Sequence, residues 1–564
     1  LETCVATFLH GDRSLRFSLS QVTSSNGDPF RAGYGTAEVL ENGPLRGRIR
    51  IRGDHQNDAE KRFMRFDVFV SLYAGVPILE ITHVLGVNDV AQSEFLAFSA
   101  LDIPIELGNG NEINRAYALT EDGQQCPLPM QGRLFQCEDD QFEIVDDQQT
   151  ARDSGIRSDG ILVADTNTGQ VFLAISEFWQ QFPKGIEIRE NGFDVELFPK
   201  LDALGAGRYT NRDDEHIWYY YLRDDVYTIR QGVEKSHLFY IGFGEEDGVS
   251  CNDEVPTSFQ VQPVALPDFD YLAETEAAGA LVAPDGVFVE WDNLFKKGFE
   301  QYVEKLQEER WYGLLNWGDW FGERIYNWGN LEYDDAAGFF WQALRFQDPE
   351  YFRQAVRGAR HYIDVDTVSQ HGYEDWEGRV WGHALGHSGG YYEAGTFHLN
   401  NYDMSDRIFH TGSSSPGHTR CEGVSLLYLL TGDIRALEHV RKIANHLSKG
   451  PMVSSDKPWG TTAREPGWAM VALAAAFDCT GDRAYLDAAQ KVSDLVIRMA
   501  EGKGIWHRPL ESRNCVYLKH PDHPRCHGEL SFPVAFQTAG MIRVYERTGR
   551  DDIRENVIAS ARYV

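Results

Sequence analysis

One stretch of the sequence concentrates side chains that can move protons. Residues 380–403 read VWGHALGHSGGYYEAGTFHLNNYD. A loop uses glycine, asparagine and aspartate for its turns, but it does not need several imidazole and phenol groups at once. Any single ring could simply fill a gap under a helical domain, whereas a cluster of acid and base groups is more typical of a site. The candidate catalytic residues of this stretch are His383, His387, Tyr391 and Tyr392.

Two further stretches offer groups that could bind a charged or hydroxyl-rich ligand. Residues 316–336 read NWGDWFGERIYNWGNLEYDDA, and residues 409–423 read FHTGSSSPGHTRCEG. Both lead into helical patterns, so Asp334 and Glu422 are expected to be helix caps or dipole partners. The tryptophans of the first stretch could equally form a packed aromatic floor. The candidates from these stretches and from the loop above are His418 as a further catalytic group, and Arg324, Tyr326, Trp328, Asn330, Asn400 and Arg420 as substrate-binding groups.

Net charge excludes several classes of partner. The chain of 564 residues has a formal charge of −33, which would repel nucleic acids and anionic membrane surfaces. No apolar run reaches the roughly 18 residues that a membrane span needs. An acidic polysaccharide or oligosaccharide would need local basic residues at its site. The 13 Trp and 25 Tyr residues suit surfaces that stack on sugar rings, although cores use them too.

A metal site is a weaker possibility. His383 and His387 have the spacing of two zinc ligands, but the surrounding glycines and the missing glutamate break the zincin pattern. Residues 515–527, CVYLKHPDHPRCH, could bind zinc, and a disulfide between Cys515 and Cys526 explains that loop equally well. No cofactor is certain, and a divalent cation such as Ca²⁺ or Zn²⁺ stays open.

The cysteines and the first residue bear on the cellular location of the protein. Eight cysteines are too few for a disulfide scaffold, but Cys126 and Cys137 could pair in an exported chain. The chain begins with Leu rather than Met, as a processed chain would. A secreted or periplasmic location is therefore expected.

Residues 1 to about 250 have the pattern of β-structure. Hairpins are predicted at 160–176 and at 185–198, the second with a type I′ turn at Asn191-Gly192. Further strands are predicted at 46–53, 65–75, 216–222 and 236–243. Short strands separated by turns favour sandwiches or barrels. We expect a barrel-like domain at 1–110 and a β-sandwich at 111–260.

The second half changes to a helical period. After a linker at 261–289, pairs of helices are predicted at 339–365, 423–447, 469–499 and 539–564. Gly is expected to end the first helix of a pair in a left-handed cap, and Asp to cap the second. Long aromatic and histidine-rich insertions separate the pairs, which argues against a regular solenoid. The pattern favours an α/α toroid over 290–564, whose end loops would line a cleft.

Four segments resemble one known family. The stretch from residue 316 to 340, GHALGHSGG at 382–390, GHTRCEG at 417–423 and EFWQQFPKGIEIRENGFDVELFP at 177–199 are similar to exo-rhamnogalacturonan lyases. These form polysaccharide lyase family 26 with its YetA-like relatives. The resemblance covers most of the chain from about residue 60. It implies a barrel-like domain, a β-sandwich and a catalytic toroid, in agreement with the periodicity.

The same resemblance implies β-elimination on a uronate-containing glycan, with exo action. In that reaction the uronate carboxylate is neutralised, a base removes the C5 proton and an acid protonates the leaving O4 oxygen. Neutralisation can come from Arg, Asn or a cation, so Asn330, His418 and Arg420 could hold the carboxylate. Lys184, in the family-like FPKG, could supply positive charge at a cleft, or could be a solvated hairpin lysine.

Other classes of function remain open. A glycoside hydrolase would need two carboxylates across the scissile bond, for which Asp319, Glu323, Asp334 and Glu422 are available. A non-catalytic glycan-binding protein would use the aromatic residues alone. The product distinguishes these classes, because only a lyase leaves an unsaturated uronate.

Overall fold

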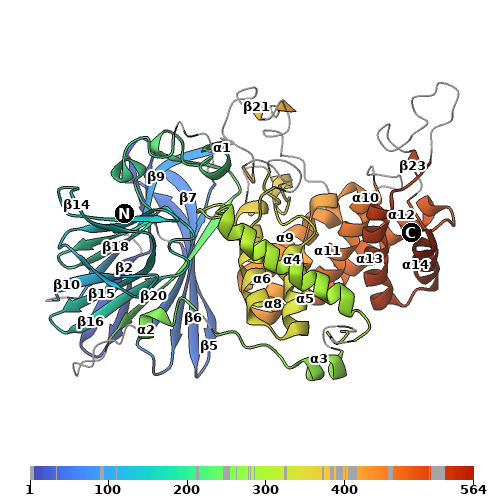
Figure 1. Ribbon diagram of the computed structural model, residues 1–564, viewed down its shortest axis with the longest axis horizontal. Helices are drawn as coiled ribbons and strands as arrows, with labels where there is room; N and C mark the ends of the chain where they lie inside the picture. Colours follow the sequence, from blue (N-terminus) through green and yellow to red (C-terminus); the bar gives the residue numbers. More distant parts are fainter. Residues whose placement is uncertain are drawn as a thin grey trace. The chain divides into compact units, whose positions relative to one another are not determined.

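The structure is a computed structural model that divides into two compact units (Figure 1). Unit 1 holds the described residues of 1–265, 288–327 and 389–409, and unit 2 holds those of 266–287, 328–388 and 410–564. The structure describes residues 5–563 except 34, 89–94, 109–110, 211, 213–214, 245–253, 262, 277–278, 280, 285, 323–326, 371–373, 382–385, 389–397, 400–401, 404–415, 455–461, 507 and 510–526.

Unit 1 is built on one antiparallel network of strands, drawn from blue to green in Figure 1. Its described residues form the strands β1 (Val5–His10), β2 (Arg13–Ser18), β3 (Gln21–Ser24), β4 (Pro29–Ala32), β5 (Thr36–Asn42), β6 (Arg46–Gln56), β7 (Arg62–Tyr73), β8 (Ile78–Gly86), β9 (Phe95–Leu107), β10 (Ile113–Thr120), β11 (Gln125–Leu128), β12 (Arg133–Glu138), β13 (Gln141–Val145), β14 (Ala151–Gly155), β15 (Ser158–Thr166), β16 (Gly169–Ile175), β17 (Lys184–Arg189), β18 (Gly192–Phe198), β19 (Tyr227–Arg230) and β20 (Glu234–Phe243). The same unit contains α1 (Glu215–Trp218), α2 (Glu254–Thr257), α4 (Val289–Glu308) and the short pair β21 (His398–Leu399) and β22 (Tyr402–Asp403).

These strands pair in two runs whose side chains meet. One run is β5–β6–β7–β8–β20–β16–β15–β10–β11, and the other is β14–β13–β12–β17–β18–β9–β3–β4. Pairing of β4 with β6 joins them at one edge. Lys184 and Phe198 of the second run both contact His237 of the first. The runs therefore pack face to face as a sandwich.

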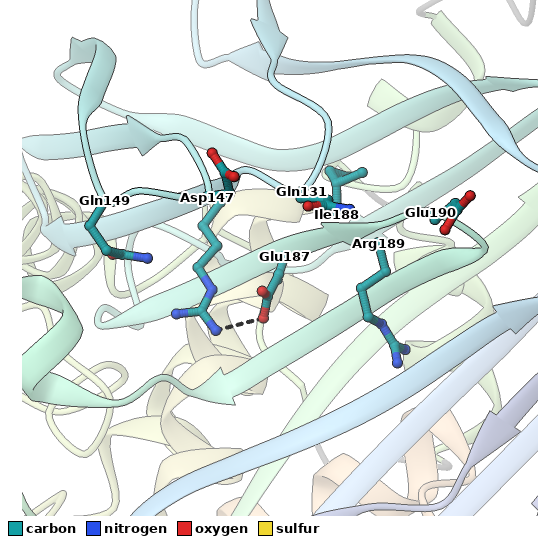
Figure 2. Close-up of a pocket in the computed structure, with 8 residues that line it drawn as sticks. Gln131, Asp147, Gln149, Glu187, Ile188, Arg189 and Glu190 are labelled. Carbon is teal, nitrogen blue, oxygen red and sulfur yellow. Dashed lines mark hydrogen bonds and ion pairs between the residues drawn. The ribbon is translucent and has the colours of Figure 1, made fainter.

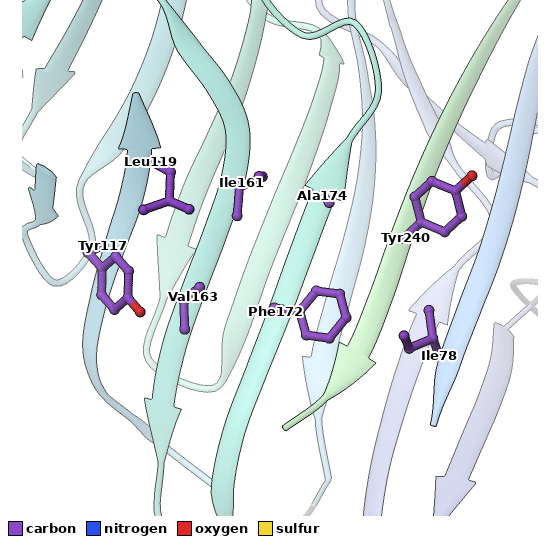
Figure 3. Close-up of a cluster of buried hydrophobic side chains, with 8 residues drawn as sticks. All are labelled: Ile78, Tyr117, Leu119, Ile161, Val163, Phe172, Ala174 and Tyr240. Carbon is purple, nitrogen blue, oxygen red and sulfur yellow. The ribbon is translucent and has the colours of Figure 1, made fainter. Parts of the chain in front are cut away.

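A hydrophobic cluster covers the face of the first run that points away from the second run. Figure 3 shows it across β10, β15, β16, β20 and β8. Phe259 closes it from outside, stacking on Tyr240 with ring centroids 4.5 Å apart. The residues of the cluster are Ile78, Tyr117, Leu119, Ile161, Val163, Phe172, Ala174 and Tyr240. The chain after the last strand thus buries a face that would otherwise be exposed and apolar.

Three predictions for the β region need correction. The boundary near residue 110 does not divide the sheet, because β8 pairs with β20 and β9 pairs with β18. Residues 216–222 are not a strand, since a helical turn, α1, and a bend occupy them. The hairpin at 185–198 exists, but Glu190 and Asn191 form its turn, and Gly192 pairs with Glu106 of β9. A Cβ on Gly192 would lie 2.0 Å from the Ile105 carbonyl oxygen, so this glycine serves close strand approach instead of the turn.

Unit 2 is helical, and apart from the green α3 its helices are drawn from yellow to red in Figure 1. Its described helices are α3 (Phe269–Thr275), α5 (Asp335–Phe346), α6 (Pro349–His361), a π-helical turn (Tyr362–Asp366), α8 (Glu422–Thr431), α9 (Ile434–Lys449), α10 (Pro451–Ser454), α11 (Arg464–Thr480), α12 (Arg483–Ala500), α13 (Ser531–Thr548) and α14 (Asp551–Tyr563), with a short strand pair β23 (Arg508–Pro509) and β24 (His527–Gly528). The four predicted helix pairs are confirmed. Their closure into a toroid stays a prediction.

Turn chemistry between paired helices is also as predicted. Gly432, Gly481 and Gly549 end α8, α11 and α13 with positive φ angles of 72°, 69° and 64°. Asp433 and Asp482 then cap α9 and α12, each accepting a hydrogen bond from the backbone N–H two residues on.

Two smaller findings complete the fold. Cys126 and Cys137 are free thiols, so the suggested disulfide between them is not formed. The pair Cys515 and Cys526 lies outside the described residues. Among the described helices, none combines the length and apolar character required to cross a bilayer.

Candidate active site

Unit 2 contains five of the predicted site residues, and unit 1 contains one. Trp328, Asn330, His387, His418 and Arg420 belong to unit 2, and Lys184 to unit 1. The other candidates, His383, Tyr391, Tyr392, Asn400, Arg324 and Tyr326, lie outside the described residues, as does the zinc candidate loop at 515–526.

Lys184 is neither a solvated lysine nor at the surface of its unit. It begins β17 with its side chain fully buried, and its Nζ lies 2.7 Å from Nδ1 of His237. Burial, with Lys235 nearby, holds the pKa of Lys184 well below its usual range. Burial also lowers the pKa of His237. The pair therefore lies inside the sandwich as a buried polar contact, which does not suit a residue that meets a substrate.

The loop before α5 has an unusual backbone. Asn330, Leu331, Tyr333 and Asp334 have φ angles of 46°, 46°, 71° and 60°, in the left-handed region that non-glycine residues rarely adopt. His387 also has a positive φ, 46°. Such strain persists only where the surroundings enforce it, and it gathers at functional sites.

Asp334 fixes the end of this loop. Its carboxylate accepts a hydrogen bond from the N–H of Ala337 in α5 and from the N–H groups of Glu422 and Gly423 in α8. One side chain therefore caps two helices, which confirms the expected capping role. Burial raises the pKa of Asp334, while these N–H groups pull it the other way.

His387 is held by two residues of the same strained loop. The imidazole stacks on Trp328, with ring centroids 4.6 Å apart. Asn330 accepts a hydrogen bond from Nδ1 of His387 at 3.2 Å and donates to the His387 carbonyl oxygen at 3.2 Å. Because Asn330 also donates to the Trp381 carbonyl, its amide orientation is fixed, and Nδ1 of His387 carries the hydrogen. Asn330 and Trp328 are buried and position His387.

A second group forms around Glu332. Nδ1 of His418 lies 2.9 Å from Oε2 of Glu332, and Nε2 of His418 accepts a hydrogen bond from Arg464 at 2.6 Å. Arg464 also donates to Oε1 of Glu332 at 3.2 Å. Arg420 places Nη2 3.1 Å from the same oxygen. Two guanidinium groups thus share one carboxylate beside an imidazole.

Exposure separates the members of this group. The side chains of His418 and Arg464 are 19% and 17% exposed, whereas that of Arg420 is 1% exposed. Arg420 lies over the Trp468 ring at 4.1 Å and exchanges two backbone hydrogen bonds with the Tyr362 hydroxyl. Arg420 therefore anchors Glu332 from inside, and His418 with Arg464 forms the accessible side.

Several members of the site were not among the predicted residues. Glu332, His361, Asp366 and Arg464 carry no recognisable spacing, because they come from three separate segments. His361 ends α6, and Asp366 ends the π-helical turn. A π-helical turn within a helix end is itself common at functional sites, but the sequence around it reads as ordinary helix.

The carboxylates needed for hydrolysis are already engaged. Asp334 caps two helices, and Glu422 bonds to Trp341 and Arg543. Asp319 is completely buried in unit 1, and Glu323 lies outside the described residues. No described pair of these carboxylates is free to flank a glycosidic bond.

Unit 1 has an open hollow of about 340 Å³ beside β17. Figure 2 shows its charged lining, which includes Glu187, Arg189 and Glu190. Arg133 forms an ion pair with Glu187 at 2.6 Å. Its lining residues are Gln131, Arg133, Asp147, Gln149, Glu187, Ile188, Arg189 and Glu190. It contains no histidine, tyrosine or cysteine, so it does not match the expected acid–base chemistry.

The fold and these groups define a β + α protein whose helical unit contains a histidine–arginine–glutamate site. The chain is similar to the uncharacterized protein YetA of Bacillus subtilis (strain 168), with 19% identity over 419 residues, 59% of this chain and 47% of YetA. It therefore spans about half the length of that curated relative. No family model matches the chain.

Two solved structures are distantly similar. A candidate aldose 1-epimerase from Escherichia coli K12 is 9% identical, and a galactose mutarotase related enzyme from Lactobacillus acidophilus is 10% identical. Each aligns over 43% of this chain and 99% of its own, with a TM-score of 0.21.

Proposed function

We propose that this protein is a polysaccharide lyase that cleaves a uronate-containing glycan by β-elimination at unit 2. The observation that carries the proposal is the His418 imidazole, which contacts Glu332 through Nδ1 and Arg464 through Nε2. This arrangement joins an oriented base to a cation suited to a carboxylate. The resemblance to exo-rhamnogalacturonan lyases supports the substrate class and exo action.

Each residue has a role in the proposed reaction. Arg464 turns from His418 to the uronate carboxylate and neutralises it, which makes the C5 proton acidic. Nε2 of His418, released by Arg464, takes that proton, and the electron pair forms the C4–C5 double bond as the C4–O4 bond breaks. Glu332 accepts the Nδ1 hydrogen bond and stabilises the imidazolium. The departing O4 oxygen takes a proton from an acid, for which His383, Tyr391 and Tyr392 remain candidates.

Local charge supports an acidic substrate despite the net charge of −33. Arg464 contacts one carboxylate, that of Glu332, which is already shared with Arg420. The carboxylate of Asp334 also interacts electrostatically with Arg420, but its oxygens already accept hydrogen bonds from backbone N–H groups. A second anion at Arg464 would therefore improve its charge balance, as a uronate requires. A polymer of this kind fits the expected secreted or periplasmic location.

The test is a scan of uronate polysaccharides, with rhamnogalacturonan and ulvan among them, followed by ultraviolet absorbance and by reducing ends. We expect absorbance from an unsaturated uronate, and a loss of about 100-fold or more in Arg464→Ala and His418→Gln. The matched control is Arg483→Ala, because Arg483 is 74% exposed at the start of α12.

Other products would contradict the proposal. New reducing ends without absorbance would indicate a hydrolase. Glycan binding without either product would indicate a binding protein.

A further inference from the structure

Three aromatic side chains of unit 2 form a contiguous, partly exposed surface, which we call the aromatic ledge. Its members are Tyr333, the residue after Glu332 in the strained loop, and Phe532 and Phe536 at the start of α13. The Phe536 ring stacks on Tyr333 with ring centroids 5.8 Å apart, and the Phe532 ring meets both of them edge-on. Phe532 is 47% exposed, and Leu530 beside it in the chain is 40% exposed. Exposed apolar residues that adjoin one another, unlike scattered ones, mark binding surfaces.

The aromatic ledge is continuous with the group around Glu332. The Phe536 ring lies 4.9 Å from the Trp468 ring between centroids. The Arg420 guanidinium lies over that Trp468 ring at 4.1 Å, and its Nη2 is 3.1 Å from Oε1 of Glu332. Direct contacts therefore lead from the exposed Phe532 to the carboxylate at the centre of the proposed site.

A second connection fixes the aromatic ledge beside Arg464. Glu529, which lies just before α13, accepts a hydrogen bond from the backbone N–H of Ala463 at 2.8 Å. Ala463 directly precedes Arg464, the first residue of α11. The two helices also pack closely, because a Cβ on Gly467 would lie 2.5 Å from the carbonyl carbon of Phe536. The start of α13 is therefore held against the start of α11, where the proposed uronate-binding arginine lies.

We propose that the aromatic ledge binds the neutral sugar that adjoins the uronate in the glycan, with the sugar ring lying on Phe532. The inference rests on the proposed lyase function, because it adds a binding subsite to the same site. A sugar ring can place the C–H groups of one face on an aromatic ring while its hydroxyl groups stay in water. A second uronate fits less well, since its carboxylate would lie against apolar ring surface. The substrate class is therefore a glycan in which uronate alternates with a neutral sugar.

The experiment measures binding of two kinds of oligosaccharide to the whole chain by calorimetry. In rhamnogalacturonan oligosaccharides uronate alternates with a neutral sugar, whereas in oligogalacturonate every residue is a uronate. His418→Gln is the background, so that the glycan is not cleaved. We expect Phe532→Ala to weaken binding of the alternating oligosaccharide about 10-fold and to change binding of oligogalacturonate far less.

Two further variants separate stacking from an effect on the fold. Phe532→Tyr keeps an aromatic ring and should restore the binding that Phe532→Ala loses. Tyr271→Ala, at an aromatic residue of α3 that is 61% exposed, is the matched control and should bind normally. Because Phe532 is itself half-exposed, Phe532→Ala should keep the far-ultraviolet circular dichroism of the unchanged chain. In the chain with His418 intact, Phe532→Ala should raise KM about 10-fold and retain most of kcat, as expected of a binding residue.

The outcomes distinguish the aromatic ledge from the lyase reaction. Weakened binding in Phe532→Ala, without unsaturated product from the wild-type chain, would support the ledge and contradict the reaction alone. Unsaturated product from the wild-type chain, with unchanged binding in Phe532→Ala, would overturn the ledge and leave the reaction intact. An equal loss for both oligosaccharides would overturn the preference for a neutral sugar.

Discussion

The carboxylate of Asp334 accepts a hydrogen bond at 3.2 Å from the backbone N–H of Gly423, a residue 89 positions further along the chain. This contact brings the start of α8 against the start of α5, and it places GHTRCEG beside the strained loop at 330–334. The glycine is needed because a Cβ there would lie 2.5 Å from Oδ1 of Asp334 and 2.9 Å from Cβ of Ala336. The two candidate groups of unit 2, one around His387 and one around Glu332, both depend on this junction.

Gly423→Ala should therefore destabilise unit 2. The added methyl group would separate the two capped helices, and overpacking of this kind costs about 1–3 kcal/mol. Urea unfolding followed by far-ultraviolet circular dichroism measures the change. Gly298→Ala, within α4 where nothing lies within 4 Å of the new Cβ, is the control and should be neutral or slightly stabilising. Equal effects of the two substitutions would contradict this account.

Glu332→Gln should lower the free energy of unfolding, because it leaves the buried Arg420 without its carboxylate partner. Removing the shared charge leaves a guanidinium that is 1% exposed without its carboxylate, and loss of one partner of a buried pair costs about 3–5 kcal/mol. Adding Arg420→Met to this variant should recover part of the lost stability, since the unpaired charge then disappears. The free energies of unfolding of the single and double variants give the coupling. Strict additivity would show that the two side chains do not stabilise each other.

Stability should fall as pH falls below about 6.5, because of two buried histidines in the sandwich. Burial lowers the pKa of His55 to about 4 and of His83 to about 3. Both rings stay neutral in the folded chain over that range, while the unfolded chain binds protons below about 6.5. Folding is therefore progressively penalised as pH falls from about 6.5 toward those lower values.

His83→Leu should remove about 2 kcal/mol of the loss between pH 7 and pH 5. Neither ring nitrogen of His83 has a hydrogen-bond partner among the described residues, so the change is not expected to destabilise the chain at pH 7. Val84→Ala, on the same strand, should lower stability equally at both pH values. If His83→Leu leaves the pH dependence unchanged, the neutral buried imidazole is excluded as its cause.

Lys184→Met should stabilise the protein at pH 7 by about 1–3 kcal/mol. Burial holds the pKa of Lys184 well below its usual range, so folding penalises the protonated form that the unfolded chain carries at pH 7. That penalty shrinks as pH rises toward 10.5, so the gain should shrink with it. Lys297→Met on the exposed face of α4 is the control. If Lys184→Met abolished catalysis while leaving the fold intact, the buried, structural role would be wrong.

Much of the helical unit could be predicted from the sequence, because its signals are local. Thr-Gly-Asp places Gly432 and Asp433 at a turn whatever packs around it. Long-range pairing could not be predicted in this way. Gly192 has the local signature of a turn, but the approach of β9 decides its role. The division at residue 110 failed for the same reason, since β8 and β20 are distant in sequence.

The sequence indicates candidate residues by their type, but it does not indicate their partners. His387 and His418 lie in the expected motifs, but their partners Asp366, Glu332 and Arg464 come from other segments. Lys184 belongs to a family-like motif and is nevertheless inside the sandwich. Burial and tertiary contacts assign these roles, and neither is encoded in local spacing.

The most direct test of the central claim compares Arg464→Ala with wild type on a free uronate glycan and on its methyl ester, with unsaturated product measured by ultraviolet absorbance. If Arg464 neutralises the carboxylate, kcat/KM should fall about 100-fold or more on the free acid and far less on the neutral ester. Arg483→Ala should match wild type on both substrates. An equal fall on acid and ester, or no unsaturated product from the wild-type protein, would contradict the assignment of β-elimination to this site.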